Sequence, residues 1–392
     1  MKLLGAALGV VASTLLLLVL LLWANPFERA NDALDYAFGA APKWTQVETL
    51  LTDPTTQETS RGEHPGPSLQ SLAAYWGSHG GAKRVVFMGN SQMQTMSLAP
   101  GETAPGATEL TYFDQVADFY REHSGNVLCY RLSAPGMSYT ETLWYLEYLL
   151  QNAALRPDAV VLQINYQAFW NGGIRHGALE MLGTPAFRAR IETLARSGQP
   201  YAEFFDEALK NYAQQRRGTT TVGAASTAQG PGYGWETEAR EQLEKTGLLE
   251  KSRAAKASFE QMLYRARLYI LRLQPSSARS ISGPRLLRSQ AAIEAIAERC
   301  RLAHVKLVLF TAPLNPRISL YRNAEDKATY ETFVQNVATK YNLPLYRFDD
   351  CVLAEYWGRL LNGPDPLHLG RRGHQIVAAK MIEIVRKTLP GE

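Results

Sequence analysis

Apolar residues are distributed very unevenly along the chain, and the longest apolar run lies at its start. Residues 3–24 carry no charge. A helix of this length, at ~1.5 Å per residue, spans about 33 Å and can cross a hydrocarbon core of ~30 Å. The run exceeds the apolar part of a cleavable signal peptide, and Leu22 stands where such a peptide would have a small residue before its cleavage site. We therefore expect an uncleaved transmembrane signal anchor over residues 1–25, with the rest of the chain extracytoplasmic, on the periplasmic or cell-surface side.

After a proline- and threonine-rich approach over residues 26–80, short apolar runs alternate with amphipathic ones. Alternation of this kind is typical of an α/β domain in which helices flank a parallel sheet, and we place that domain at 81–392. The apolar runs predict strands at 84–88, 126–132, 158–164, 305–310 and 343–348. The amphipathic runs predict helices at 112–123, 140–155, 289–302 and 373–387.

One connection in this pattern is far too long. About 140 residues separate the third and fourth strands, where units of this type normally use ~2–6 residues. The composition of 176–215 and 235–272 favours helices, whereas 218–234 resembles a flexible loop. We expect a large helical insertion at 166–285, acting as a lid or docking surface over the carboxyl edge of the sheet.

Charge and cysteine content narrow the function classes. The chain has 41 basic and 37 acidic residues and no long run of either sign, which argues against nucleic-acid binding. Three cysteines are too few for a disulfide scaffold. We consider one bridge, between Cys300 and Cys351, and interpret Cys129 as a buried strand residue. The histidines do not cluster with cysteines or carboxylates at ligand spacing, so neither a metal nor a cofactor is expected.

Polar residues follow the predicted strands at the edge where parallel sheets bind ligands. Ser91 comes directly after the first strand, in Gly89-Asn90-Ser91, and Gly136 follows the second. Asn165 follows the third strand. Taken alone, a Gly-x-Ser turn after a strand is commonly only a helix cap.

The C-terminal segment supplies what a serine nucleophile needs. A serine hydroxyl requires an adjacent base, and in Asp365-Pro-Leu-His368 the histidine can be that base while the carboxylate orients it. His374 is the nearest competitor, but it has no carboxylate at comparable spacing. The order of these residues along the chain predicts a Ser91, His368 and Asp365 relay.

These motifs resemble those of the SGNH/GDSL hydrolase superfamily. Gly89-Asn90-Ser91 matches its serine block, Gly136 its glycine block, Asn165 its asparagine block, and residues 365–378 its Asp-x-x-His block. The resemblance implies a flavodoxin-like fold and an acyl-serine mechanism. It also implies an oxyanion hole made of the Ser91 amide, the Gly136 amide and the Asn165 side chain. The chain departs from the family pattern in two places, with Asn90 for the usual Asp and Gln163-Ile-Asn165-Tyr166 for Gly-x-Asn-Asp.

The anchor narrows the resemblance. An anchored SGNH domain is similar in plan to the DltD family of D-alanyl-lipoteichoic acid biosynthesis and to AlgJ/AlgX-type exopolysaccharide O-acetyltransferases. The segment 311–316 also resembles a loop of the DltD family. This implies an extracytoplasmic serine esterase or O-acyltransferase acting on acyl esters of a cell-surface polysaccharide or teichoic-acid-like polymer, beside a polytopic membrane-bound acyltransferase. The residues do not distinguish acetyl from D-alanyl transfer.

Two other functions stay open at this point. The altered third block and the insertion are compatible with a non-catalytic scaffold or glycan-binding partner of an acyltransferase. A general lipase or thioesterase would require a broad apolar cleft.

Overall fold

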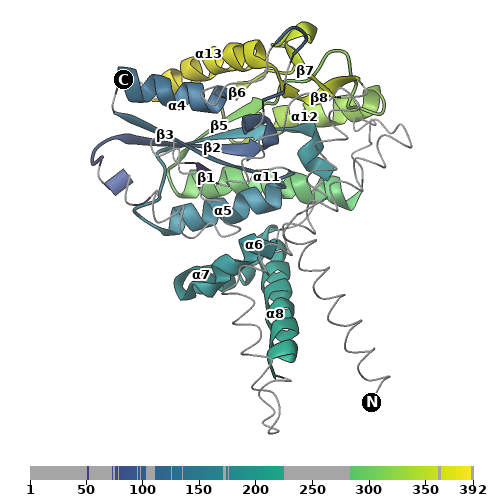
Figure 1. Cartoon of the computed structure of the whole chain (residues 1–392). Coiled ribbons are helices and arrows are strands. Elements are labelled where there is room, and N and C mark those ends of the chain that lie inside the picture. Colours follow the sequence, from purple (N-terminus) through teal and green to yellow (C-terminus); the bar gives the residue numbers. More distant parts are fainter. Residues whose placement is uncertain are drawn as a thin grey trace, which may run out of the picture. The chain divides into compact units, whose positions relative to one another are not determined.

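The computed structural model describes residues 51–52, 73–224 and 283–389, apart from gaps at 74–75, 78, 95, 98, 103–110, 125, 135, 171–173, 175 and 361–362 (Figure 1). The chain divides into two units, and the one formed by Trp44–Gln215 and Ser276–Glu392 contains all of the described residues except 216–224. Within the described ranges, no helix has both the length and the apolar character that a bilayer crossing requires. The anchor expected at 1–25 and the helix expected at 235–272 lie outside these ranges.

A six-stranded sheet forms the centre of this unit, and five of its strands are parallel. The strands are β1 (Leu51–Thr52), β2 (Lys83–Asn90), β3 (Val127–Ala134), β4 (Ala159–Ile164), β5 (Lys306–Thr311) and β6 (Leu345–Tyr346). Their order is β1-β3-β2-β4-β5-β6, with β1 antiparallel at the edge. The five predicted strands are confirmed. Counted along the chain, the parallel strands stand in the order 2-1-3-4-5 of flavodoxin-like sheets, whose order reverses between the first and third strands, here β2 and β4.

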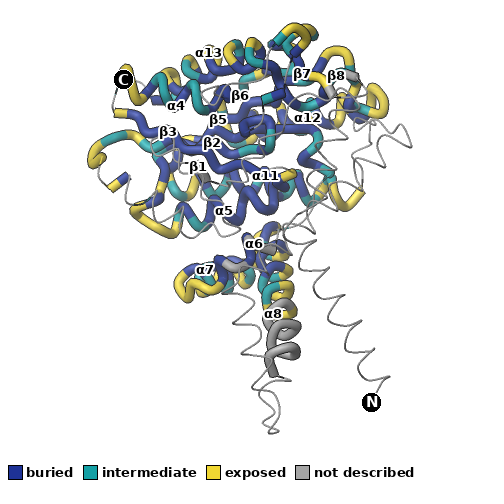
Figure 2. The backbone as a smooth tube through the Cα atoms, viewed as in Figure 1, coloured by how far each residue is buried: buried dark blue, intermediate teal, exposed yellow. Residues whose placement is uncertain are grey.

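The strands are continuous apolar runs because both faces of the sheet are covered. In β2, Val86 and Met88 pack into one core, and Val85 and Phe87 pack into the other. Side chains of a strand point alternately to its two faces, so a strand between two helical layers needs apolar residues at every position. The central strands are accordingly buried along their length (Figure 2).

Helices cover the two faces. The helices α4 (Tyr112–His123) and α13 (Arg371–Thr388) pack on one face; α5 (Tyr139–Gln151), α11 (Pro284–Leu302) and α12 (Ala324–Lys340) pack on the other. The bounds of α4 agree with the predicted ones, and its first turn is closed by the Asp114 carboxylate, which accepts the Thr111 N–H at 3.0 Å. α11 begins five residues earlier than expected, because its proline stands in the first turn, where a missing N–H costs nothing.

The described part of the insertion is helical. It contains the short helices η2 (Tyr166–Trp170), α6 (His176–Leu179) and η3 (Glu180–Gly183), followed by α7 (Pro185–Ala195) and α8 (Ala202–Ala224). The helical prediction for 176–215 is confirmed. The loop expected at 218–234 is wrong over 218–224, where α8 continues. These seven residues include no proline, and an interior glycine costs a helix only ~1 kcal/mol.

A buried carboxylate links this insertion to the sheet layer. Glu147 of α5 is fully buried and accepts hydrogen bonds from Arg190 of α7, at 3.1 Å, and from Arg299 of α11. A buried charge of this kind is tolerated only when it is paired. The three side chains therefore hold α5, α7 and α11 together.

The predicted bridge between Cys300 and Cys351 is wrong, and both thiols are free. Cys300 lies in the core on the α5 and α11 side of the sheet, whereas Cys351 packs against the core on the α4 and α13 side. The sheet separates the two side chains. Cys129 is buried in β3, as expected.

A hairpin outside the main sheet carries the C-terminal motif. After the short helix η4 (Ala354–Tyr356), β7 (Trp357–Leu360) pairs antiparallel with β8 (Gly363–Leu369). The pairing is irregular, because Trp357 faces Leu369 while Arg359 faces Pro364. Residues 365–368 therefore form a bulge within this hairpin.

Candidate active site

Ser91 stands at the end of β2, where the chain turns into the short helix η1 (Ser91–Met93). Two side chains fix this turn. The Asn90 Oδ1 accepts the Gln92 N–H at 3.0 Å, and Arg131 donates to the Met93 carbonyl at 2.8 Å. The first contact caps the N-terminus of η1 and the second binds its last carbonyl, so the serine is held on a short, rigid turn.

The bulge in β8 brings His368 and Asp365 to this serine. The His368 Nε2 lies 3.1 Å from the Ser91 Oγ, although 277 residues separate the two in sequence. The His368 Nδ1 lies 3.1 Å and 3.2 Å from the two carboxylate oxygens of Asp365. Because a carboxylate only accepts, this contact places the ring proton on Nδ1 and leaves Nε2 as an acceptor facing the serine hydroxyl.

Backbone contacts hold the Asp365 carboxylate in its ionised form. Its Oδ1 accepts the N–H groups of Leu367, at 2.8 Å, and of His368, at 3.0 Å. Burial by itself would raise the pKa of Asp365, but the charge of His368 and these hydrogen bonds outweigh it and lower the pKa below its usual value. An ionised Asp365 is the form that can stabilise a charged imidazole.

The other two predicted residues follow the strands on either side of β2. Gly136 comes after β3 with φ 65°, and the turn is closed by the Met137 N–H, which donates to the Ala134 carbonyl at 3.1 Å. This left-handed backbone favours glycine. Asn165 comes directly after β4 and is buried, and its Oδ1 accepts the Gln167 N–H at 2.8 Å. A side-chain amide whose oxygen is bound in this way presents its Nδ2 donor to other neighbours.

The structure therefore brings together the edge of three adjacent strands and the C-terminal bulge. Ser91, Gly136 and Asn165 follow β2, β3 and β4, at the point where the strand order reverses. Ligands of open α/β sheets bind at this point.

The competing histidine does not contact the serine. His374 of α13 is fully buried, and its Nδ1 accepts the Tyr112 N–H at 3.0 Å. Its ring also stacks on the Tyr112 ring, with centroids 5.7 Å apart. His374 therefore attaches α13 to the start of α4.

Two buried glutamines next to the serine were not predicted as site residues. Gln92 follows Ser91 directly, and Gln163 lies in β4, two residues before Asn165. The one signal that could have found Gln163 is its place in an otherwise apolar strand, since a buried polar side chain needs partners. Asn315 is a third buried amide side chain that was not predicted as a site residue. Its Nδ2 donates to the Asp365 carbonyl at 2.8 Å.

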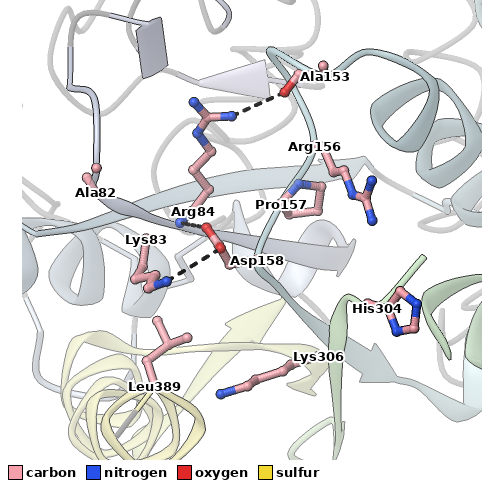
Figure 3. Close-up of a pocket in the computed structure, with 11 residues that line it drawn as sticks. Ala82, Lys83, Arg84, Ala153, Arg156, Pro157, Asp158, His304, Lys306 and Leu389 are labelled. Carbon is pink, nitrogen blue, oxygen red and sulfur yellow. Dashed lines mark hydrogen bonds and ion pairs between the residues drawn. The ribbon is translucent and has the colours of Figure 1, made fainter. Parts of the chain in front are cut away.

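A hollow of about 730 Å³ lies at the opposite, amino edge of the sheet (Figure 3). It is rich in cations, and Asp158 is the one carboxylate among the described residues that line it. The lining cations are Lys83, Arg84, Arg156 and Lys306. Asp158 binds Lys83 at 3.9 Å and the Arg84 N–H at 2.9 Å.

Three of these cations bind carbonyl groups at helix ends. Lys306 donates to the Thr388 carbonyl of α13 at 2.9 Å, and Arg156 donates to the Ala303 carbonyl beyond α11. Arg84 donates to the Ala154 carbonyl beyond α5 at 3.2 Å. Cations are favoured at helix C-termini, where carbonyls lack partners. We therefore assign these three cations to helix ends and Lys83 to its ion pair with Asp158.

No group of three or more histidine, cysteine, aspartate or glutamate side chains that could hold a metal ion occurs in the part of the chain that the structure describes.

No family model matches the sequence, and no curated protein matches it. Three solved structures are similar to this chain in their backbone. A psychrotrophic esterase from Pseudoalteromonas sp. has 10% identity and a TM-score of 0.37, covering 78% of this chain and 97% of that one. An acetylxylan esterase from Geobacillus stearothermophilus has 12% identity and a TM-score of 0.37, covering 77% and 94%. A GDSL-like lipase from Bacteroides thetaiotaomicron has 11% identity and a TM-score of 0.34, covering 82% and 98%.

Proposed function

We propose that this protein is a membrane-anchored, extracytoplasmic serine esterase or O-acyltransferase of the SGNH type. The observation that carries the proposal is the contact of His368 with the Ser91 hydroxyl on one side and with the buried Asp365 carboxylate on the other. A serine that touches a histidine, itself oriented by a carboxylate, is the arrangement that nucleophilic acyl transfer requires.

In the first half of the reaction, the Ser91 Oγ attacks the carbonyl carbon of an ester while its proton passes to the His368 Nε2. Asp365 stabilises the resulting imidazolium. When the tetrahedral intermediate collapses, the bond to the leaving alcohol breaks, and His368 gives its proton to that alcohol's oxygen. The product is an acyl-Ser91 ester.

The oxyanion of the intermediate needs preorganised donors. We assign this role to the backbone N–H groups of Ser91 and Gly136 and to the Asn165 Nδ2. Support comes from their shared place at the carboxyl edge of adjacent strands and from the bound Asn165 Oδ1.

In the second half, a hydroxyl group attacks the acyl-Ser91 carbonyl and gives its proton to His368, which returns it to the Ser91 Oγ. If water supplies the hydroxyl, the protein is an esterase. If a sugar or polyol supplies it, the protein is an O-acyltransferase. We propose that the acyl ester belongs to a cell-surface polysaccharide or teichoic-acid-like polymer, handled beside a polytopic membrane-bound acyltransferase. The uncharged run at residues 3–24 supports this location.

The proposal is tested by labelling the full chain with a fluorophosphonate, which reacts with activated serines. We expect labelling of the wild type at Ser91, no labelling of Ser91→Ala, and loss of aryl acetate hydrolysis in His368→Ala. Equal labelling of wild type and Ser91→Ala would disprove the assignment. Released acetate, measured against acetylated acceptor in the presence of a polysaccharide, separates hydrolysis from transfer.

The membrane location has its own test. The full chain should stay in carbonate-washed membranes and be digested by protease added from the extracytoplasmic side. Recovery in the soluble fraction would contradict the anchor without affecting the serine assignment.

The second candidate is a non-catalytic scaffold or glycan-binding partner of an acyltransferase. The Gln163-Ile-Asn165 sequence favours it, because the glutamine replaces a small residue next to the serine turn. A wild-type protein that is folded, unlabelled by the fluorophosphonate and able to retain a polysaccharide would support this candidate.

A further inference from the structure

Two buried glutamines connect the segment that carries Ser91 to the segment that carries His368. Gln163 is 2% exposed and Gln92 is 1% exposed. The Gln163 Oε1 accepts the backbone N–H of Asn90 at 3.1 Å, and its Nε2 donates to the Gln92 Oε1 at 2.8 Å. The Gln92 Nε2 then donates to two carbonyls, that of Leu367 at 2.9 Å and that of Pro313 at 3.0 Å. We call this chain of contacts the amide relay.

The direction of the relay is determined at both ends by backbone groups. An N–H can only donate, so the oxygen of Gln163 must face Asn90 and its nitrogen must face Gln92. Carbonyl groups can only accept, so the nitrogen of Gln92 must face Leu367 and Pro313. If either amide were reversed, donors would face donors and acceptors would face acceptors at several contacts. The site is buried, so each unsatisfied group would be costly.

The two ends of the relay are the residues that precede the reacting side chains. Asn90 precedes Ser91, and Leu367 precedes His368. The relay crosses from β2 through β4 to the bulge of β8, so it links three segments that lie far apart in the sequence.

Gly89 provides the space for this arrangement. A Cβ at Gly89 would lie 2.6 Å from the Gln163 Oε1 and 2.9 Å from its Cβ. Contacts this short do not occur between real side chains. The Met93 Cε would lie 2.6 Å from the same Cβ, so a glycine at position 89 leaves room for both Gln163 and Met93.

We propose that Gln92 and Gln163 are positioning residues whose amide relay sets the distance between the Ser91 hydroxyl and the His368 ring. This inference rests on the proposed acyl-serine function. Neither glutamine takes a proton in the reaction, and each acts through the residue next to the one that does.

The test uses Gln92→Met, Gln163→Met and the double variant in the full chain, because methionine keeps most of the volume and removes the polar end. Fluorophosphonate labelling followed by intact-protein mass gives two quantities, the final labelled fraction and the labelling rate constant. The fraction counts folded sites, and the rate reports the reactivity of each site.

We expect the final fraction to stay near that of wild type and the rate constant to fall about 10²-fold in each single variant, which is the effect of misplacing reacting groups by ~1 Å. The double variant should fall no further, because the two side chains act as one unit. With an aryl acetate, kcat should fall while KM changes by less than about threefold. A merely structural role would lower the labelled fraction and leave the rate per site unchanged.

The matched control is Gln94→Met. Gln94 is also buried near this turn, but its Nε2 donates to the Ser133 carbonyl at 2.6 Å. Its labelling rate should stay within about threefold of wild type.

Three results would contradict the positioning role of the amide relay. They are wild-type labelling rates in Gln92→Met and Gln163→Met, a labelling rate about 10⁴-fold lower in the double variant, or equal slowing in Gln94→Met. If wild type itself is not labelled at Ser91, the proposed function fails and the relay falls with it.

Discussion

Charged side chains at the two edges of the sheet differ in their burial and in the groups that they bind. The amino edge has the large hollow and four cations, all near solvent, and three of these bind carbonyls at helix ends. At the carboxyl edge, the Asp365 carboxylate is 1% exposed and is bound by His368 and two backbone N–H groups.

The difference shows which features indicate a reactive site. The cations at the helix ends bind backbone carbonyls close to solvent, where water can replace a lost partner. Polar groups that are buried and ordered by one another keep a fixed geometry, because no water is available to replace a lost partner. Mutual ordering of buried groups, more than charge or hollow size, therefore distinguishes the site at Ser91.

The largest expected effect comes from Asp365→Asn at the carboxyl edge. An amide nitrogen facing the His368 Nδ1 donates where the carboxylate accepted, so the ring proton moves to Nε2 and the ring can no longer take the serine proton. We expect kcat for aryl ester hydrolysis to fall by about 10³–10⁴-fold with little change in KM. A fall of less than tenfold would show that Asp365 does not orient the base.

Gly89→Ala should produce the next largest effect, on stability. The new Cβ would overlap Gln163, and forcing a methyl group into a packed site costs about 1–3 kcal/mol. Urea denaturation measures this as a lower free energy of unfolding. Adding Gln163→Ala removes the contact with the Gln163 Oε1 and leaves those with the Gln163 Cβ and the Met93 Cε, so the double variant should cost somewhat less than the sum of the single ones. Additive costs would mean that the two positions do not interact.

A third prediction concerns acid stability. The pKa of Asp365 is lowered in the folded protein, so its ionised form stabilises the fold above the unfolded value of ~3.9, and this contribution is lost as the pH falls through the lower folded pKa. Asparagine does not titrate. The difference in free energy of unfolding between wild type and Asp365→Asn should therefore shrink as the pH falls from about 5 to below 4. A difference that grows on acidification would mean that folding raises the pKa of Asp365 instead of lowering it.

The smallest expected effect is at the amino edge. Arg156→Ala removes the side chain that binds the Ala303 carbonyl beyond α11, and losing a cation from a helix C-terminus costs about 0.3–1 kcal/mol. The fluorophosphonate labelling rate should not change. A slower rate in Arg156→Ala would show that the two edges are coupled and would break the contrast between them.

Much of the fold could be predicted from local patterns. All five parallel strands follow short apolar runs and α4 follows an amphipathic one, and both patterns depend on residues a few positions apart. The hairpin of β7 and β8 was not predicted, because the segment with Asp365 and His368 contains two prolines and has no alternating pattern. The disulfide prediction failed because spacing says nothing about which face of the sheet a cysteine occupies.

The site was predicted in part. Ser91, Asp365 and His368 carry their chemistry in the side chain and their spacing in a motif, so the sequence points to them directly. Gln92 and Gln163 carry no reactive group. They were missed because their importance depends only on the partners that the fold supplies.

By itself, therefore, the sequence determined the order of the strands along the chain and the residue types able to form a serine, histidine and carboxylate relay. The tertiary structure alone decided that His368, and not His374, contacts Ser91, and that two glutamines join the segments carrying them. The physical reason is the sequence separation of the residues that determine each feature. Periodicity and motifs are set by neighbours in sequence, whereas the contact between Ser91 and His368 closes over 277 residues and exists only once the sheet and the hairpin have formed.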